Sequence, residues 1–392
     1  MKAWKRASGV LALNRQTTLL LIAILVIGAG EEMWMRFLPK YLEALGASAF
    51  LIAAFDAIKT LLGAVYAYPG GYIADRFGHR SAFIGFTAAS IAGYVMVVLL
   101  PSPAGVIAAM FLFLAWSDFS LPATFSLVAA SLPANKHAMG IGMQSLIRRI
   151  PVIAGPIAGG ILIDKLGIVR GVRTGAGVSI VLAVFAGLLL IRLVRRSAEP
   201  ASLHGFRRIV AGFTPELKRL LFSDILIRFC ERLPFAWIVI YAMDQGINAT
   251  DVGVLTAVEM IAAIACYVPA SLLADRYGKE PFVVATFVMY TIHPLVLAAS
   301  HTFPLFAVAF AVRGLKEFGE PARKSLIVSY SPPAARAATV GAYYLIRDSV
   351  VTAGSFAGAA LWQLGPKVNF LAAAAVGALA TLVYVSGLLR RR

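Results

Sequence analysis

The chain has 392 residues, of which 60% are hydrophobic and only 14% are charged, and its formal net charge is +17. A soluble domain averages about 25% charged residues, so this composition excludes an ordinary globular protein and favours a chain that lies in a membrane. In such a chain the excess positive charge lies against anionic lipid, and we expect no nucleic-acid partner.

Apolar blocks follow one another along nearly the whole chain. A membrane-spanning helix needs about 20 mostly apolar residues, and about twelve blocks reach that length. Their approximate positions are 17–38, 47–70, 81–100, 104–130, 138–163, 173–194, 219–242, 250–273, 281–300, 304–330, 336–363 and 368–389. We predict an all-α integral membrane protein. Because so little chain lies outside the blocks, we expect no soluble catalytic domain and no enzyme.

Lys and Arg are concentrated in alternate connections between these blocks. They gather before the first block, after the second and the eighth, at the carboxyl end, and in the stretch 197–218, which we predict to be a basic linker. By the positive-inside rule, both termini and this linker are expected to be cytoplasmic. The low loop content suggests a prokaryotic inner membrane, with membrane lipid as a partner, and we expect a monomer.

The second half of the chain repeats the first. Gly71–Arg80 and Ser271–Glu280 are similar in sequence at an offset of 200 residues. Asp118 recurs as Glu317, one step out of register at an offset of 199. We therefore predict two copies of one six-helix unit that form two pseudo-symmetric bundles, residues 1–196 and residues 219–392.

Two motifs carry a resemblance to a known family. The pattern Gly-x-x-Ala-Asp-Arg-x-Gly-x-Arg resembles the loop signature of the major facilitator superfamily, between its helices 2 and 3. Its residues here are Gly71, Asp75, Arg76, Gly78 and Arg80, and the weaker second copy keeps Asp275, Arg276 and Gly278. The run Gly-Pro-x-x-Gly-Gly is similar to a helix 5 motif of the drug/proton antiporter branch, and its residues are Gly155, Pro156, Gly159 and Gly160.

The resemblance implies the major facilitator fold and a secondary active transporter that works by rocker-switch alternating access. A small molecule is the implied substrate and the proton the implied coupling ion. The helix 5 motif implies efflux of a small amphipathic compound, which is our leading prediction.

Many charges lie near the middle of the predicted helices, where each costs at least ~2.5–3.5 kcal/mol if it faces lipid. In the superfamily, helices 1, 4, 7 and 10 line a central cavity, and the charges on these helices are our candidates. Those for proton coupling are Glu31, Glu32, Asp118 and Glu317, because a carboxylate taken out of water holds a proton more readily. Those for the substrate cavity are Arg228, Glu231, Arg232, Lys316 and Glu320. Charges nearer the helix ends, such as Asp224 and Arg323, are expected to snorkel.

The repeat also suggests ion pairs between the two halves. In the superfamily, helix 2 faces helix 11 and helix 5 faces helix 8. Lys59 then meets Asp348, and the pseudo-symmetric contact joins Arg149 to Glu259. We predict that these two pairs bias alternating access.

Different functions stay open at this point. Arg228 and Arg232 lie four residues apart on one helix face and suit a carboxylate or phosphate, which favours uptake or exchange of an organic anion. Alternatively, Glu231 and Glu320 neutralise these cations. A third hypothesis is a non-transporting membrane sensor on the same fold. Scattered histidines and two cysteines inside predicted helices suggest neither a metal nor a cofactor.

Overall fold

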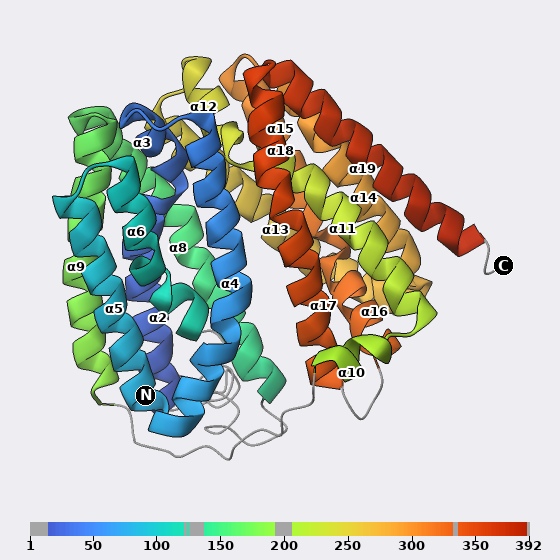
Figure 1. Ribbon diagram of the computed structural model, residues 1–392, viewed down its shortest axis with the longest axis horizontal. Helices are drawn as coiled ribbons and strands as arrows, with labels where there is room; N and C mark the ends of the chain where they lie inside the picture. Colours follow the sequence, from blue (N-terminus) through green and yellow to red (C-terminus); the bar gives the residue numbers. More distant parts are fainter. Residues whose placement is uncertain (1–14, 121–123, 125–136, 193–205, 332–335, 390–392) are drawn as a thin grey trace, which may run out of the picture. The chain divides into compact units, whose positions relative to one another are not determined.

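The computed structural model describes residues 15–120, 124, 137–192, 206–331 and 336–389. Over these residues the chain is helical and contains no strand, which confirms the predicted all-α class. The chain forms two compact units (Figure 1). Unit 1 consists of Met1–Gly46 and Val65–Ala201, and unit 2 of Ala47–Ala64 and Ser202–Arg392. The predicted division at the linker stays a prediction, since residues 193–205 lie outside the described part.

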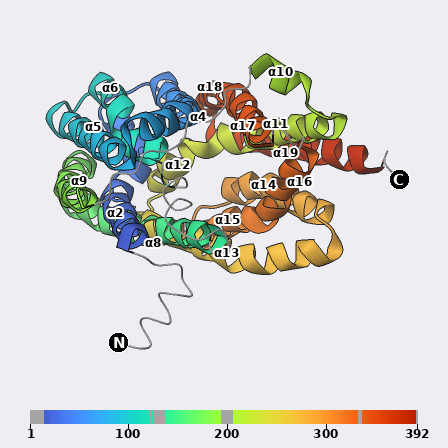
Figure 2. The same cartoon turned by 90° about the horizontal axis from the view of Figure 1, so that it is seen from below.

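Unit 1 is a bundle of long helices. In chain order it contains α2 (Arg15–Glu32), the 3₁₀ turn η1 (Met35–Phe37), α3 (Leu38–Ala44), the second part of α4 (Ala49–Phe77), α5 (His79–Leu99), α6 (Pro103–Phe113), the π-helical turn η2 (Ala115–Phe119), α8 (His137–Leu166) and α9 (Ile168–Leu190). Helix α2 packs against α8 and α9, while α5 packs against α6 and α9 (Figure 2). These contacts place α2 between neighbours along much of its length.

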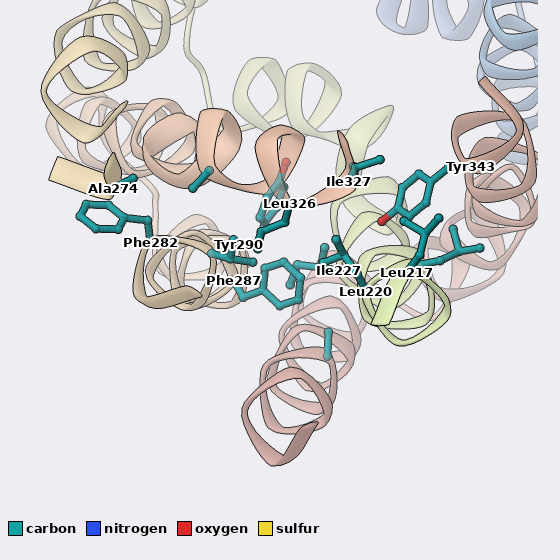
Figure 3. Close-up of a cluster of buried hydrophobic side chains, with 14 of the residues drawn as sticks. Leu217, Leu220, Ile227, Ala274, Phe282, Phe287, Tyr290, Leu326, Ile327 and Tyr343 are labelled. Atoms are coloured by element: carbon teal, nitrogen blue, oxygen red, sulfur yellow. The ribbon is translucent and has the colours of Figure 1, made fainter. Parts of the chain in front are cut away.

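Unit 2 is also a bundle of helices. It contains the first part of α4, α10 (Phe206–Ala211), α11 (Pro215–Phe235), α12 (Trp237–Asp244), α13 (Ala249–Tyr277), α14 (Glu280–Ala298), α15 (Phe303–Leu315), the 3₁₀ turn η4 (Lys316–Gly319), α16 (Glu320–Tyr330), α17 (Arg336–Val351), α18 (Ala353–Gln363) and α19 (Pro366–Leu389). Apolar side chains from α11, α14, α16 and α17 form one buried cluster, which includes Ile227, Phe287, Ile327 and Tyr343 (Figure 3).

Described helices occupy every predicted apolar block. Six stretches are long and apolar enough to cross a membrane by length and composition: Gln16–Ala44, His79–Leu99, Ile168–Leu190, Ala249–Cys266, Glu280–Ala298 and Pro366–Leu389. Other blocks are interrupted, as where α15 gives way to η4 and where α17 ends at Val351 before α18 begins. Such breaks allow backbone and polar side chains to be satisfied inside the protein instead of facing lipid.

The loop signature is mostly helical, which corrects the predicted loop at residues 71–80. Helix α4 continues to Phe77 and α5 begins at His79, so Gly78 alone makes the turn, with φ of 81°. In unit 2, Gly278, with φ of 91°, and Lys279 lie between α13 and α14. Glycine adopts a positive φ without steric cost, which explains why one residue is enough to reverse the chain in unit 1.

A π-helical turn explains the one-residue shift between the repeats. The N-cap residues Ser102 and Thr302 lie 200 apart, whereas Asp118 and Glu317 lie 199 apart. Between them unit 1 has the five-residue π turn η2, and unit 2 has the four-residue 3₁₀ turn η4. Ser90 supports the irregular backbone: its hydroxyl accepts from the Trp116 amide at 2.8 Å and donates to the Phe113 carbonyl at 3.1 Å. A single π turn inside a helix often marks a functional site.

Candidate functional site

The centre of unit 1 holds a buried carboxylate, Glu31 on α2, whose exposed fraction is 6%. The Tyr94 hydroxyl donates to Glu31 Oε1 at 2.6 Å, and Ser117 Oγ donates to Glu31 Oε2 at 2.8 Å. Both donors are neutral, and within the described part of the chain Glu31 takes part in no salt bridge. This carboxylate is therefore satisfied by hydrogen bonds alone. The π turn η2 supplies one of the two donors, because Ser117 lies within it.

Neighbouring aromatic side chains fix the position of Tyr94. The buried indole of Trp34 donates from Nε1 to Ser179 Oγ at 2.9 Å. Its ring meets Tyr94 edge-on, with 6.0 Å between centroids and 84° between planes, and it packs against Phe113 at 5.2 Å. Because these rings are held by α5, α6 and α9 together, the hydroxyl of Tyr94 has little freedom to leave Glu31.

The helix 5 motif packs directly against the segment that carries the carboxylates. An added Cβ at Gly159 would overlap the backbone carbonyl of Met33, and one at Gly155 would press on the side chain of Glu32. Small residues let two helix backbones approach this closely inside a membrane protein. The predicted motif thus sets the distance between α8 and the end of α2. Its other members, Pro156 and Gly160, are buried in the same helix.

The remaining unit 1 candidates surround this region. Glu32 and Asp118 are partly buried, at the end of α2 and within η2. Arg149 on α8 is also partly buried. Next to it, Arg148 has two guanidinium nitrogens, Nε and Nη2, without a hydrogen-bond partner among the described residues. Arg148 is not among the predicted site residues.

Unit 2 holds its charges in a continuous network. Arg228 on α11 donates to Glu231 Oε2 at 2.8 Å and also bonds Glu320. Lys316 bonds the other oxygen of Glu231. Arg228 and Lys316 both lie over the ring of Tyr290, each 5.3 Å from its centroid. Two predicted cavity cations are thus held by two predicted cavity carboxylates.

The network continues toward the start of α11 through residues that were expected to snorkel. Asp224 and Arg323 are instead buried, with exposed fractions of 0% and 2%, and they form an ion pair. Arg323 also bonds Glu320 at 2.7 Å, and the Tyr343 hydroxyl donates to Asp224 at 3.0 Å. Arg347 donates to Asp224 at 3.4 Å. The expectation of snorkelling was wrong because charged and polar partners on α11, α16 and α17 bond both groups inside unit 2.

The buried and partly buried cations of this network equal its carboxylates in number. The cations are Arg228, Lys316, Arg323 and Arg347, and the carboxylates are Asp224, Glu231, Glu320 and Asp348; the exposed Lys324 also lies 3.9 Å from Glu320. Buried charges are stable only when paired, and breaking such a pair is costly. The pairing favours the interpretation in which Glu231 and Glu320 neutralise the cations, and it argues against a preference for organic anions.

Arg232 is held apart from Arg228 by a different carboxylate. It donates to Asp56 Oδ1 at 3.0 Å, and Ser355 Oγ donates to Asp56 Oδ2 at 2.6 Å. Asp56 lies in the first part of α4, which belongs to unit 2. Asp56 is not among the predicted site residues, and only the packing of α4 reveals its partner.

The two carboxylates of the predicted gating pairs bond other residues within unit 2. Glu259 accepts from Arg313 Nη1 at 3.2 Å, and Asp348 accepts from Arg347 Nε at 2.8 Å. The pairings of Lys59 with Asp348 and of Arg149 with Glu259 stay predictions.

The positions of the loop-signature residues follow from the helix bounds. The first copy spans the end of α4, which holds Gly71, Asp75 and Arg76, the turn at Gly78, and the first turn of α5, which holds Arg80. In the second copy, the last turn of α13 holds Asp275 and Arg276, and Gly278 follows the helix. Glu317 lies in η4 and is partly buried.

Comparison with known proteins decides the family. A family model described as Major Facilitator Superfamily matches residues 20–243 and 220–392. The chain belongs to this superfamily. It is therefore an integral membrane protein and a secondary transporter of a small molecule, as the repeated signature predicted.

Relatives of this superfamily member are bacterial transporters. The multidrug resistance protein MdtG of Escherichia coli (strain K12 / DH10B) is 25% identical over 380 residues, 93% of this chain and 92% of the relative. The protein of the same name from Enterobacter lignolyticus (strain SCF1) is 25% identical over 290 residues, 70% of this chain and 68% of the relative.

Solved structures show the same fold. A POT family transporter in complex with 5-aminolevulinic acid has a TM-score of 0.79 and 13% identity, covering 96% of each chain. The nucleoside transporter NupG has a TM-score of 0.77 and 13% identity, covering 95% of this chain and 99% of its own. At these identities the likeness concerns the fold alone.

Proposed function

We propose that this transporter exports small amphipathic compounds in exchange for protons, by rocker-switch alternating access, with Glu31 as the group that takes up and releases the proton. The observation that carries the proposal is the environment of Glu31: a buried carboxylate whose hydrogen bonds come from the two hydroxyls of Tyr94 and Ser117. Burial disfavours the charged form of a carboxylate, so binding a proton stabilises a carboxylate in such a place.

The two hydroxyls suit both protonation states. When Glu31 is ionised, it accepts from Tyr94 and from Ser117, as observed. When it is protonated, its own O–H can donate to the hydroxyl oxygen of Ser117, because a hydroxyl both donates and accepts. Among the described residues, no salt bridge of Glu31 has to break in this exchange. Proton transfer therefore costs little reorganisation around the site.

Two features support export as the direction. The helix 5 motif resembles that of drug/proton antiporters, and its glycines pack against the end of the helix that carries Glu31. The bacterial relatives that align over most of this chain carry the name multidrug resistance protein. We place the protein in the bacterial inner membrane as a monomer, with both termini on the cytoplasmic side, in agreement with the distribution of Lys and Arg.

The test is flux of a fluorescent lipophilic cation into inside-out membrane vesicles whose lumen is acidified. An exporter coupled to protons accumulates the dye in the lumen, and Glu31→Gln abolishes accumulation because glutamine cannot carry the proton. The matched control is Glu43→Gln, which removes a partly exposed glutamate paired with Lys40 on α3. Accumulation by Glu31→Gln equal to that of the wild type contradicts the role of Glu31. Gradient-driven uptake of an organic anion in right-side-out vesicles contradicts the direction.

A further inference from the structure

A cavity of about 390 Å³ lies in unit 2 at the ends of three helices. Lys218, Arg219 and Phe222 line it from the start of α11, Tyr330 from the end of α16, and Tyr384 and Gly387 from the end of α19. Figure 1 shows the start of α11 and the end of α19 together at the lower right of this unit. The cavity shares no residue with the charge network described above, so it needs an explanation of its own.

The rim of the cavity is positively charged. Lys218 and Arg219 are both exposed, and Glu216 is the carboxylate among the lining residues. Two cations and one carboxylate leave one net positive charge, which matches the single negative charge of a phosphodiester. The backbone at this helix start is already capped, because Thr214 Oγ1 accepts from the Leu217 amide at 3.2 Å. The two side chains, and not the helix end, supply the attraction.

Apolar side chains also line the cavity. Phe222 on α11 is 56% exposed, and Val383 and Leu388 on α19 are partly buried lining residues. These three side chains form the apolar wall of the cavity. A headgroup bound at the rim thus has apolar side chains in the same cavity for one of its tails.

We propose that this cavity binds an anionic phospholipid, with the phosphodiester between Lys218 and Arg219 and an acyl chain against Phe222, Val383 and Leu388. Tyr330 and Tyr384 fit this assignment, because tyrosine is enriched at the level of lipid headgroups. A free inorganic phosphate would use the cations but would leave the apolar wall unoccupied.

Lipid binding is tested on the purified full-length protein by native mass spectrometry with phosphatidylglycerol and with phosphatidylcholine. We expect preferential retention of phosphatidylglycerol, and binding about tenfold weaker or more in the double variant Lys218→Ala/Arg219→Ala, since each basic residue near anionic lipid contributes separately. The matched control is Arg170→Ala/Lys367→Ala, which removes two exposed cations elsewhere. It is expected to bind phosphatidylglycerol as the wild type does.

Two further variants separate the headgroup from the tail. Gly387→Phe fills the cavity without a change in charge, because a Cβ at Gly387 meets nothing within 4 Å. It is expected to weaken phosphatidylglycerol binding while leaving the melting temperature of the lipid-free protein unchanged. Glu216→Gln is expected to strengthen binding, since it removes the carboxylate beside the two cations.

Several results overturn the proposal. One is equal retention of the two lipids by the wild type, and another is equal loss of binding in the control and in Lys218→Ala/Arg219→Ala. Displacement of phosphatidylglycerol by inorganic phosphate, with no effect of Gly387→Phe, would assign the cavity to a free anion. Unchanged binding in both Gly387→Phe and the double variant would exclude this cavity altogether.

Discussion

Each unit carries a glutamate at the equivalent position of the repeat, but the side chains that contact the two glutamates differ. Glu31 and Glu231 lie 200 residues apart, and Ser117 and Lys316 lie 199 apart, which is the offset of their helices. In unit 1 the carboxylate accepts from the serine hydroxyl, and in unit 2 it bonds the lysine. One position is thus suited to exchange a proton, and the other is fixed in an ion pair.

One close backbone contact beside these glutamates is the same in both units. A Cβ at Gly159 would overlap the carbonyl of Met33, and a Cβ at Gly358 would overlap the carbonyl of Leu233, the equivalent residue. Helix packing was kept while the partners of the glutamate diverged. Under the proposed mechanism, a few side chains, and not the fold, would decide which half responds to protons.

Installing the unit 2 pairing in unit 1 should have the largest effect. Ser117→Lys places an ammonium beside Glu31, and the resulting ion pair should hold the carboxylate in its charged form. We expect gradient-driven dye accumulation in vesicles to fall to the background of empty vesicles. Ser117→Ala is the comparison: it removes one hydrogen bond to Glu31 without adding a charge, and accumulation should fall severalfold and not to the background. Full accumulation by Ser117→Lys would mean that the serine position does not govern Glu31.

The two glutamates should also differ in how much their substitution lowers the free energy of unfolding. Glu231→Gln leaves Lys316 without its carboxylate and should lower the free energy of unfolding by about 3–5 kcal/mol, the cost of breaking a buried pair. Glu31→Gln keeps its hydroxyl partners and should change it by less than about 1 kcal/mol. Denaturation by increasing SDS measures both. Equal losses would show that the two carboxylates have the same role.

The shared packing predicts equal effects in the two units. Gly159→Ala and Gly358→Ala each force a methyl group onto a backbone carbonyl and should each cost about 1–3 kcal/mol of unfolding free energy. Gly177→Ala is the control, because its Cβ meets nothing within 4 Å. The same SDS titration measures all three. A loss in one unit alone would mean that the repeats do not share this contact.

The smallest effect is expected at Tyr94. Tyr94→Phe removes the 2.6 Å hydrogen bond to Glu31 but keeps the ring against Trp34. One hydrogen bond to a charged group is worth about 1.5–3 kcal/mol, and less is lost when the carboxyl is protonated. The rate of gradient-driven transport should therefore fall severalfold without being abolished. A rate equal to that of the wild type would mean that the Tyr94 hydroxyl has no role in transport.

Much of the fold could be predicted from the sequence, because the length of the apolar blocks and the internal repeat are both properties of the order of residues along the chain. The π turn was readable in part: the offset changes from 200 to 199 between Ser102 and Asp118, although block length alone gives no sign of it. Glu31 was found because a carboxylate in the middle of an apolar helix is costly wherever it points.

The partners of the unit 2 charges could not be predicted in the same way. Spacing along one helix places Arg228 near Glu231, but the rotation of neighbouring helices decides that Asp56 meets Arg232. For the same reason Asp224 and Arg323 looked like end charges and are buried partners. Contacts between helices depend on packing, which the spacing of residues within one helix does not contain.

The most direct test of the central claim is proton release from the purified protein in weakly buffered detergent solution when a lipophilic cation binds. Wild-type protein and Glu231→Gln should both release protons, and Glu31→Gln should bind the cation and release none. Release by Glu31→Gln equal to that of the wild type would contradict the assignment of the proton to Glu31.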